Sequence, residues 1–334
     1  MPIRFRIGIE INEDSVMFEK IIEKINSAQR IGLFAHVNPD GDALGSMYSL
    51  KNVLASMGKN GEVFLCGKAE SSVFNLIYDG ETPKCEPEDC DLLIALDSSD
   101  IDRLGEWKEA FSAHSNTAAI DHHITHIKYA NETVVEDISS NCELLCGMYK
   151  EMSANISEKT ATDLYIGIAT DTGSFKYSSV TGDTHRAAAW LIEKGARFDY
   201  VSKKIFDTKS KEYFEILRLA ISKIKYYAGG RIAYLCLEGE DFARCGIEEA
   251  DANAVVSLPG SVEGVEASIY VRRRGEDEYK VSLRSSGYVD VARIALGFGG
   301  GGHVKAAGFS LTGSEFDSGV KDLISRISEQ LEQK

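Results

Sequence analysis

Two stretches of the chain decide the fold that we predict: LLIALD at residues 92–97 and TAAIDHH at residues 117–123. Each is a short apolar run that ends in residue types able to bind a metal ion. A third run, IGLFAH at residues 31–36, precedes the turn NPDGD at residues 38–42. Helical patterns fill the segments between these runs. Apolar strands that alternate with helices are typical of a parallel sheet covered by helices on both faces, so we predict an α/β fold.

The pattern changes after about residue 228, where strand patterns replace helical ones. Three strands are predicted there, at residues 231–237, 265–273 and 279–284. We therefore expect two domains. The first is a parallel-sheet domain at residues 1–207, and the second is a smaller mixed α/β domain at residues 208–334, with a ligand bound in the cleft between them.

The composition argues against several classes of protein. The 334 residues carry a formal net charge of −15, which repels polyanions and disfavours a protein that coats long nucleic acid. A short anionic ligand in a local basic pocket, or one held by metal ions, is compatible with this charge. No apolar run approaches the roughly 20 residues that cross a bilayer, and the N-terminus lacks the apolar core of a signal peptide. We expect a cytoplasmic protein without a membrane partner.

The chain has seven cysteines and no CxxC pair. Cys142 and Cys146 are four residues apart, which leaves zinc binding open, but no second pair matches them. We interpret the cysteines as free thiols of a reducing compartment.

Metal-binding residue types end three of the predicted strands. These residues are His36, Asp97 and the run Asp121-His122-His123. Because the carboxyl ends of neighbouring parallel strands line one crevice, we expect these side chains to meet. A single Asp after a strand often caps a helix instead. Three such ends in one sheet favour a shared site.

Two further carboxylates, Asp40 and Asp42, flank Gly41 in the turn after the first strand. Gly41 allows the backbone to fold so that both carboxylates point inward. The spacing of an EF-hand calcium loop is absent. Imidazole together with carboxylate suits Mn²⁺, Zn²⁺ or Fe²⁺, and the carboxylates are numerous enough to hold two divalent ions.

Together these residues resemble the four motifs of the DHH phosphoesterase superfamily, in the expected order. The motifs read His36-x-x-Pro39-Asp40-Gly41-Asp42-x-x-Gly45-Ser46, Asp97, Asp121-His122-His123 and Asp171-Thr172-Gly173. The segment Gly299–His303 with Ala306-Ala307-Gly308 resembles the accessory domain of one branch. That branch includes nanoRNases, phosphatases of 3′-phosphoadenosine-5′-phosphate (pAp) and dinucleotide phosphodiesterases. The resemblance covers about residues 17–312.

The resemblance implies two bound divalent ions, expected to be Mn²⁺. One ion is expected on His36, Asp40 and Asp97, and the other on Asp42, Asp97, His122 and Asp171. Asp97 would then bridge the two ions.

The resemblance also implies roles for two residues beside the metal ligands. Asp121 is expected to orient His122, and His123 to face the phosphate, where it would stabilise charge or protonate the leaving oxygen. The segment that begins at Asp171 also resembles the active-site segment of aspartic proteases. Those enzymes need two such segments on an all-β frame, and only one is present here after a predicted helix, so the metal ligand is favoured.

The implied substrate-binding residues lie in the second domain. They are Arg284, Ser285, Gly300, Gly301, Gly302 and His303. Arg284 and Ser285 resemble the family's Arg-Ser element that grips nucleotide phosphate. Backbone N–H groups of a glycine loop can approach an anion closely. A flexible surface loop is the alternative interpretation of the glycines.

The implied activity is metal-dependent hydrolysis of phosphoesters. Expected substrates are short oligoribonucleotides, cleaved to mononucleotides, and nucleotide bisphosphates such as pAp, which would lose the 3′-phosphate. A homodimer is compatible with the sequence. Alternatives are a phosphodiesterase of linear or cyclic di-AMP, a manganese inorganic pyrophosphatase and an RNA- or nucleotide-binding module without catalysis. We interpret the remaining histidines His114, His126 and His185 as surface or core residues.

Overall fold

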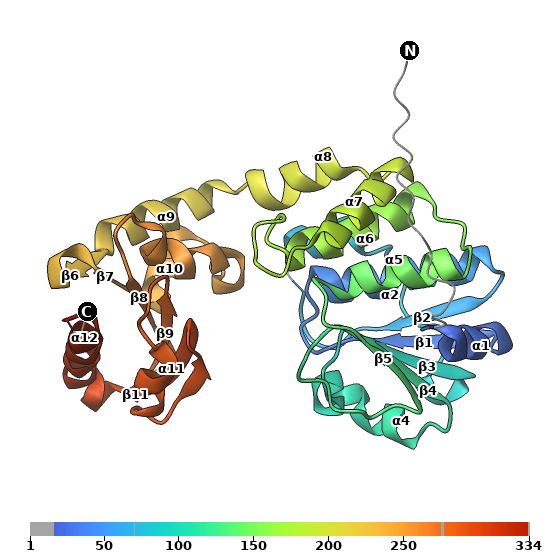
Figure 1. The fold of residues 1–334 in the computed structure, drawn as a ribbon, viewed down its shortest axis with the longest axis horizontal. Helices are drawn as coiled ribbons and strands as arrows, with labels where there is room; N and C mark the ends of the chain where they lie inside the picture. The colour runs from blue at the N-terminus through green and yellow to red at the C-terminus, as the bar shows by residue number, and fades with distance from the viewer. Residues whose placement is uncertain (1–16, 70, 275–276, 333–334) are drawn as a thin grey trace, which may run out of the picture. The chain divides into compact units, whose positions relative to one another are not determined.

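The computed structural model describes residues 17–69, 71–274 and 277–332. The chain divides into two compact units, Met1–Thr208 and Lys209–Lys334. Each unit has its own sheet (Figure 1). Each also has its own hydrophobic core.

The sheet of the first unit has five parallel strands in the order β2-β1-β3-β4-β5. The strands are β1 (Arg30–Phe34), β2 (Asn60–Phe64), β3 (Leu92–Leu96), β4 (Thr117–Asp121) and β5 (Glu132–Val135). The strand order reverses direction between β1 and β3, which are paired with each other. A reversal of this kind opens a crevice at the carboxyl ends of the two strands, where ligands bind in open α/β sheets.

Helices cover both faces of this sheet, as predicted (Figure 1). They are α1 (Glu19–Ser27), α2 (Gly41–Ser56), α3 (Ser71–Ile77), α4 (Lys108–Ala113), α5 (Asn141–Glu151), α6 (Glu158–Asp171), α7 (Gly182–Glu193) and α8 (Phe198–Val201), with 3-10 segments at Pro87–Asp89 and Ile101–Trp107 and a π-helical segment at Ser202–Asp207. On one face, Leu33 and Ile94 pack in the core with Leu164 of α6. On the other face, Ala95 packs with Phe111 of α4.

Helices α2 and α6 approach each other closely because glycines lie where they meet. A Cβ atom on Gly45 would lie 2.6 Å from the carbonyl oxygen of Asp163, and one on Gly41 would overlap the side chain of Thr170. The contact brings the first turn of α2, which carries Asp42, beside the last turns of α6, which carries Asp171.

The second unit has a six-stranded mixed sheet in the order β10-β11-β9-β8-β7-β6. Its strands are β6 (Lys225–Tyr227), β7 (Ile232–Leu237), β8 (Ala267–Arg274), β9 (Glu278–Ser285), β10 (Gly301–His303) and β11 (Ala306–Thr312). Its helices are α9 (Lys211–Lys223), α10 (Gly239–Cys245), α11 (Val291–Leu296) and α12 (Phe316–Glu332), with 3-10 segments at Ala228–Gly230, Glu249–Ser261 and Gly313–Glu315. Strands β7 and β8 pair in parallel and the other neighbours pair antiparallel. The mixed α/β architecture is the one predicted.

The glycine-rich segment differs from the loop that we expected. Gly301–His303 forms β10 and pairs antiparallel with β11. A Cβ atom on Gly302 would lie 2.5 Å from the carbonyl oxygen of Ala306, and one on Gly300 would overlap the carbonyl oxygen of Gly308. Glycine is therefore required at these two positions by backbone packing. No helix in the described ranges combines the length and the apolar composition needed to span a membrane.

Candidate active site

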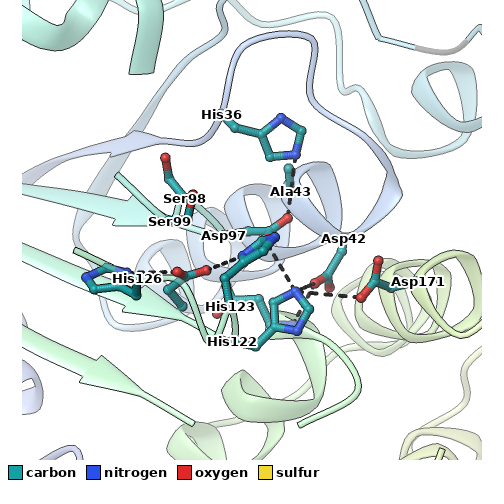
Figure 2. Close-up of polar contacts among 12 residues, drawn as sticks. His36, Asp42, Ala43, Asp97, Ser98, Ser99, His122, His123, His126 and Asp171 are labelled. Atoms are coloured by element: carbon teal, nitrogen blue, oxygen red, sulfur yellow. Dashed lines mark hydrogen bonds and ion pairs between the residues drawn. The ribbon is translucent and has the colours of Figure 1, made fainter. Parts of the chain in front are cut away.

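The predicted ligands of the first unit converge at the carboxyl edge of its sheet (Figure 2). His36 follows β1, Asp97 directly follows β3, and His122 directly follows β4. Helix α2 contributes Asp42 from its first turn, and Asp171 is the last residue of α6. Residues from five separate elements thus meet beside the reversal of strand order between β1 and β3.

A first group of ligand atoms surrounds the imidazole of His36. Its Nε2 atom lies 3.7 Å from Oδ2 of Asp40 and 3.7 Å from Oδ2 of Asp97. The three atoms are close enough to one another to bind a single metal ion. They are the three residues expected to hold the first ion.

A second group surrounds the imidazole of His122. Its Nε2 atom lies 3.3 Å from Oδ1 of Asp97, 3.6 Å from Oδ2 of Asp171 and 3.7 Å from Oδ2 of Asp42. Asp42, His122 and Asp171 form a three-residue set within reach of one ion. These are ligands expected for the second ion.

Asp97 connects the two groups through its two carboxylate oxygens. Oδ2 faces His36 and Oδ1 faces His122. The residue is 2% exposed, and its Oδ1 atom makes no hydrogen bond within the described part of the chain. A buried oxygen without a hydrogen-bond donor is costly unless a cation binds it. The arrangement therefore fits a metal ion.

The two ligand histidines are held with one ring nitrogen turned inward. Nδ1 of His36 lies 3.0 Å from the carbonyl oxygen of Val37, and Nδ1 of His122 lies 3.1 Å from that of Ile138. A carbonyl oxygen only accepts, so each Nδ1 carries the proton and donates it. The Nε2 atoms then face the carboxylates, which is the orientation in which an ion can replace the Nε2 protons and bind the rings.

Helix N-termini fix the two carboxylates of the turn. Asp40 caps α2, and its Oδ1 atom accepts the N–H groups of Asp42 and Ala43. The buried carboxylate of Asp42 accepts the N–H groups of Asn141 at 2.6 Å and Cys142 at 2.9 Å, at the start of α5. The positive end of a helix favours a charged carboxylate at this place.

The site concentrates negative charge in a buried volume. Burial alone lowers the pKa of His122, but the nearby carboxylates, Asp97 first, outweigh burial and raise it to about 10. Burial, together with repulsion from Asp97, raises the pKa of Asp42 well above its usual range. Burial likewise raises the pKa of Asp171 to about 6. The carboxylates therefore favour positive charge at this place, and divalent cations would supply it.

The carboxylate of Asp121 does not contact His122 as expected. Its Oδ1 atom lies 2.8 Å from Nδ1 of His123, and its Oδ2 atom lies 2.8 Å from Nδ1 of His126. The expectation that Asp121 orients His122 is wrong, because the carbonyl oxygen of Ile138 holds that ring instead. The two histidine bonds hold the pKa of Asp121 below its usual range, although burial opposes this.

The predicted substrate-binding residues lie in the second unit. Arg284 and Ser285, at the end of β9, line a pocket of about 240 Å³ together with Lys305. The hydroxyl oxygen of Ser285 is buried and makes no hydrogen bond among the described residues. His303 is exposed at the end of β10 and does not line this pocket.

The sequence matches two families in the order of the two units. The description "DHH family, N-terminal domain" applies to residues 30–168, and "DHHA1 domain" applies to residues 229–333. A bifunctional oligoribonuclease and PAP phosphatase NrnA from Thermus thermophilus is 31% identical over 307 residues, which span 90% of each protein. The chain belongs to the DHH family.

Two other similar proteins extend this comparison. An exopolyphosphatase-related protein from Bacteroides fragilis has a solved structure that matches with a TM-score of 0.84 and 26% identity, covering 95% of this chain and 97% of that one. A cyclic-di-AMP phosphodiesterase PdeA from Listeria monocytogenes is 26% identical over a match that spans 93% of this chain and 49% of the Listeria protein. The α/β fold is therefore that of DHH-family proteins.

His126 is the residue of this DHH-family site that sequence reasoning missed. We interpreted it as a surface or core histidine. Its side chain is 5% exposed, in agreement with a core position, but it also bonds to Asp121, which the sequence did not indicate. The signal in the sequence was a further histidine five positions after Asp121. His114 bonds two backbone carbonyl oxygens, and His185 stacks on Phe175.

Proposed function

We propose that this chain is a two-metal phosphoesterase that hydrolyses short oligoribonucleotides to mononucleotides and removes the 3′-phosphate of pAp. The observation that carries the proposal is the position of Asp97, whose two carboxylate oxygens face two separate groups of ligands. A carboxylate shared by two groups of ligands suits a pair of divalent ions, and paired ions are a known solution for phosphoester hydrolysis.

The proposed ligands divide as the resemblance implied. His36, Asp40 and Asp97 would hold one ion, and Asp42, Asp97, His122 and Asp171 the other. Ions bound there would neutralise the phosphoryl oxygens and activate the attacking water. Imidazole with carboxylate ligands suits Mn²⁺.

His123 is placed to act on the substrate itself. Its side chain is 35% exposed, in contrast to that of His122 at 12%. Because Nδ1 donates to Asp121, Nε2 is the ring nitrogen available to a phosphoryl or leaving-group oxygen. We assign His123, with both ring nitrogens protonated, the role of donor to that oxygen.

The preference for short substrates has two supports. The net charge of −15 repels long polyanions, and relatives that cover most of this chain are named oligoribonuclease and PAP phosphatase.

In the second unit, Arg284, Lys305 and the unbonded hydroxyl of Ser285 line one pocket. Two cations and a free hydroxyl donor suit a single phosphate group. We propose that Arg284 and Ser285 bind substrate there, and that Gly300, Gly301, Gly302 and His303 add contacts.

A phosphodiesterase of linear or cyclic di-AMP is the second candidate. The similarity to the Listeria phosphodiesterase supports it. The support is weaker, because that protein is about twice as long as the segment it shares with this chain.

One substrate panel tests the proposal. Purified protein is incubated with pAp, pApA, a five-nucleotide RNA, a 24-nucleotide RNA and cyclic di-AMP, each with Mn²⁺, Mg²⁺ or chelator, and products are separated by chromatography. We expect AMP from pAp and mononucleotides from the short RNAs, with no turnover in chelator. Asp97→Asn is the control, since it removes the charge and one of the two oxygens of the shared ligand, while asparagine tolerates the left-handed backbone (φ 54°) at this position. Turnover that persists in chelator or in Asp97→Asn would refute the proposal.

A further inference from the structure

His126 lies outside the metal ligands, yet it shares a carboxylate with His123. One oxygen of Asp121 accepts a hydrogen bond from Nδ1 of His123, and the other accepts one from Nδ1 of His126, each at 2.8 Å. Asp121 is 0% exposed. The three residues form a continuous chain of hydrogen bonds that ends at the partly exposed ring of His123.

The hydrogen bonds define which nitrogen of each ring carries a proton. A carboxylate only accepts, so Nδ1 is protonated in both histidines. The Nε2 atom of His126 is buried and has no hydrogen-bond partner among the described residues. A buried polar atom without a partner calls for an explanation. The explanation that we favour is the hydrogen bond that Nδ1 of the same ring donates to Asp121.

The ring of His126 is itself held in place. It stacks on Tyr129 with 5.3 Å between ring centres, and the Tyr129 hydroxyl donates to the carbonyl oxygen of Ser98. The neighbouring N–H of Ile127 donates to the carbonyl oxygen of Ser99. Ser98 and Ser99 directly follow Asp97. Hydrogen bonds therefore hold the loop that carries His126 against the end of β3, next to Asp97.

We propose that His126 is a positioning residue for His123. By occupying the second oxygen of Asp121, it prevents that carboxylate from rotating away from His123. His123 then keeps its proton on Nδ1 and presents Nε2 to the substrate. The role rests on the proposed function, because it requires that His123 acts on a phosphoester.

Matched substitutions separate this role from a general contribution to folding. His126→Phe keeps a ring to stack on Tyr129 and removes the donor to Asp121. His126→Asn places an amide N–H near the position of Nδ1 and restores the donor. His123→Ala and the double variant complete a cycle. His114→Phe is the control, since His114 bonds backbone carbonyl oxygens of Cys90 and Asn116, which precede β3 and β4.

The kinetic measurement uses full-length protein with Mn²⁺ and pAp. We expect His126→Phe to lower kcat about tenfold while KM and the Mn²⁺ dissociation constant stay within about twofold. His126→Asn should recover most of the loss. In the His123→Ala background, His126→Phe should have no further effect, because residues that act through one another are not additive. An equal fall in both backgrounds, or no recovery in His126→Asn, would overturn the proposal.

A measurement that needs no turnover stands beside the kinetics. In metal-free protein with ¹⁵N-labelled histidine, at a pH high enough for the ring of His123 to be neutral, its ring nitrogens are expected to report a proton on Nδ1 rather than on Nε2. His126→Phe should convert His123 to a mixture of tautomers, and His114→Phe should not. If His126→Phe does not fold, His126→Leu replaces it. An unchanged His123 spectrum in the variant overturns the proposal.

Failure of the proposed function would look different. It would be overturned by a wild-type protein that turns over none of the substrates. The spectra would still test the link between His126 and His123 in that case.

Discussion

The carboxylate of Asp42 accepts the backbone N–H of Cys142 at 2.9 Å, although 100 residues separate the two in the sequence. The N–H of Asn141 reaches the other oxygen at 2.6 Å. A proposed metal ligand on α2 is thus oriented by the N-terminus of α5. A ligand fixed before metal binds loses less conformational entropy when the ion arrives.

The hydrogen bond from Asn141 can be removed without breaking α5. Asn141 is the first residue of this helix, where proline is tolerated, and Ser140 before it has the extended backbone that proline prefers. We expect Asn141→Pro to weaken Mn²⁺ binding by about tenfold, since a charge-assisted bond to Asp42 is lost. Asn141→Ala is the control, because it keeps the N–H and loses only the side-chain bond to Ser46. Calorimetric titration measures the Mn²⁺ affinity of both variants. Equal affinities of Asn141→Pro and Asn141→Ala would contradict the role of this N–H.

A methyl group at Gly167 is expected to disturb the same carboxylate. A Cβ atom there would lie 2.8 Å from Oδ1 of Asp42 and would overlap the sulfur of Cys142. We expect Gly167→Ala to lower the free energy of unfolding by about 1–3 kcal/mol and to weaken Mn²⁺ binding. Cys142→Ala in the same chain should recover part of the stability. Gly239→Ala, where a Cβ would meet nothing within 4 Å, is the control in urea unfolding.

Asp163 is expected to make stability depend on pH. Burial raises the pKa of this carboxyl from 3.8 to about 7, against the attraction of Lys159. Between these values the folded chain holds a proton that the unfolded chain has released, so the stability contributed by Asp163 is complete below pH 3.8 and is lost as the pH rises through 7.

The comparison with Asp163→Asn isolates this contribution. From pH 4 to pH 7, we expect the unfolding free energy of the wild type to fall by about 2–4 kcal/mol relative to this variant. Asp183→Asn, at an exposed ion pair, should show no such difference. Urea unfolding at several pH values measures both, and parallel profiles of wild type and Asp163→Asn would be evidence against a raised pKa.

Arg284 is expected to act on substrate binding rather than on chemistry. Its pocket in the second unit contains no proposed metal ligand. We expect Arg284→Gln to raise KM for pAp about tenfold, because a charged hydrogen bond to phosphate contributes about 1.5–3 kcal/mol, and to leave kcat nearly unchanged. Arg218→Gln, on an exposed residue paired with Glu215, is the control in steady-state assays. A loss in kcat at constant KM would assign Arg284 a different role.

Several elements could be predicted because their signals are local. The apolar run Leu92–Leu96 is β3 at the residues predicted, since an uninterrupted apolar run of this length is typical of a parallel strand that is covered on both faces. Strand β5, with its half-buried residues Glu132–Val135, was not predicted. Strand β10 was also not predicted, because its glycines carry no strand signal and pairing with β11 alone makes them extended.

The amino-acid sequence by itself determined the α/β class and placed ligand residue types such as Asp97 and His122 at strand ends. It could do so because the spacing of apolar residues along the chain indicates which segments form buried strands and which form helices. The tertiary structure decided which groups touch. It directed Asp121 to His123 and His126 rather than to His122, and it set the N-terminus of α5 against Asp42. Hydrogen bonds depend on rotamers and on the packing of segments far apart in the chain, which a linear pattern does not specify.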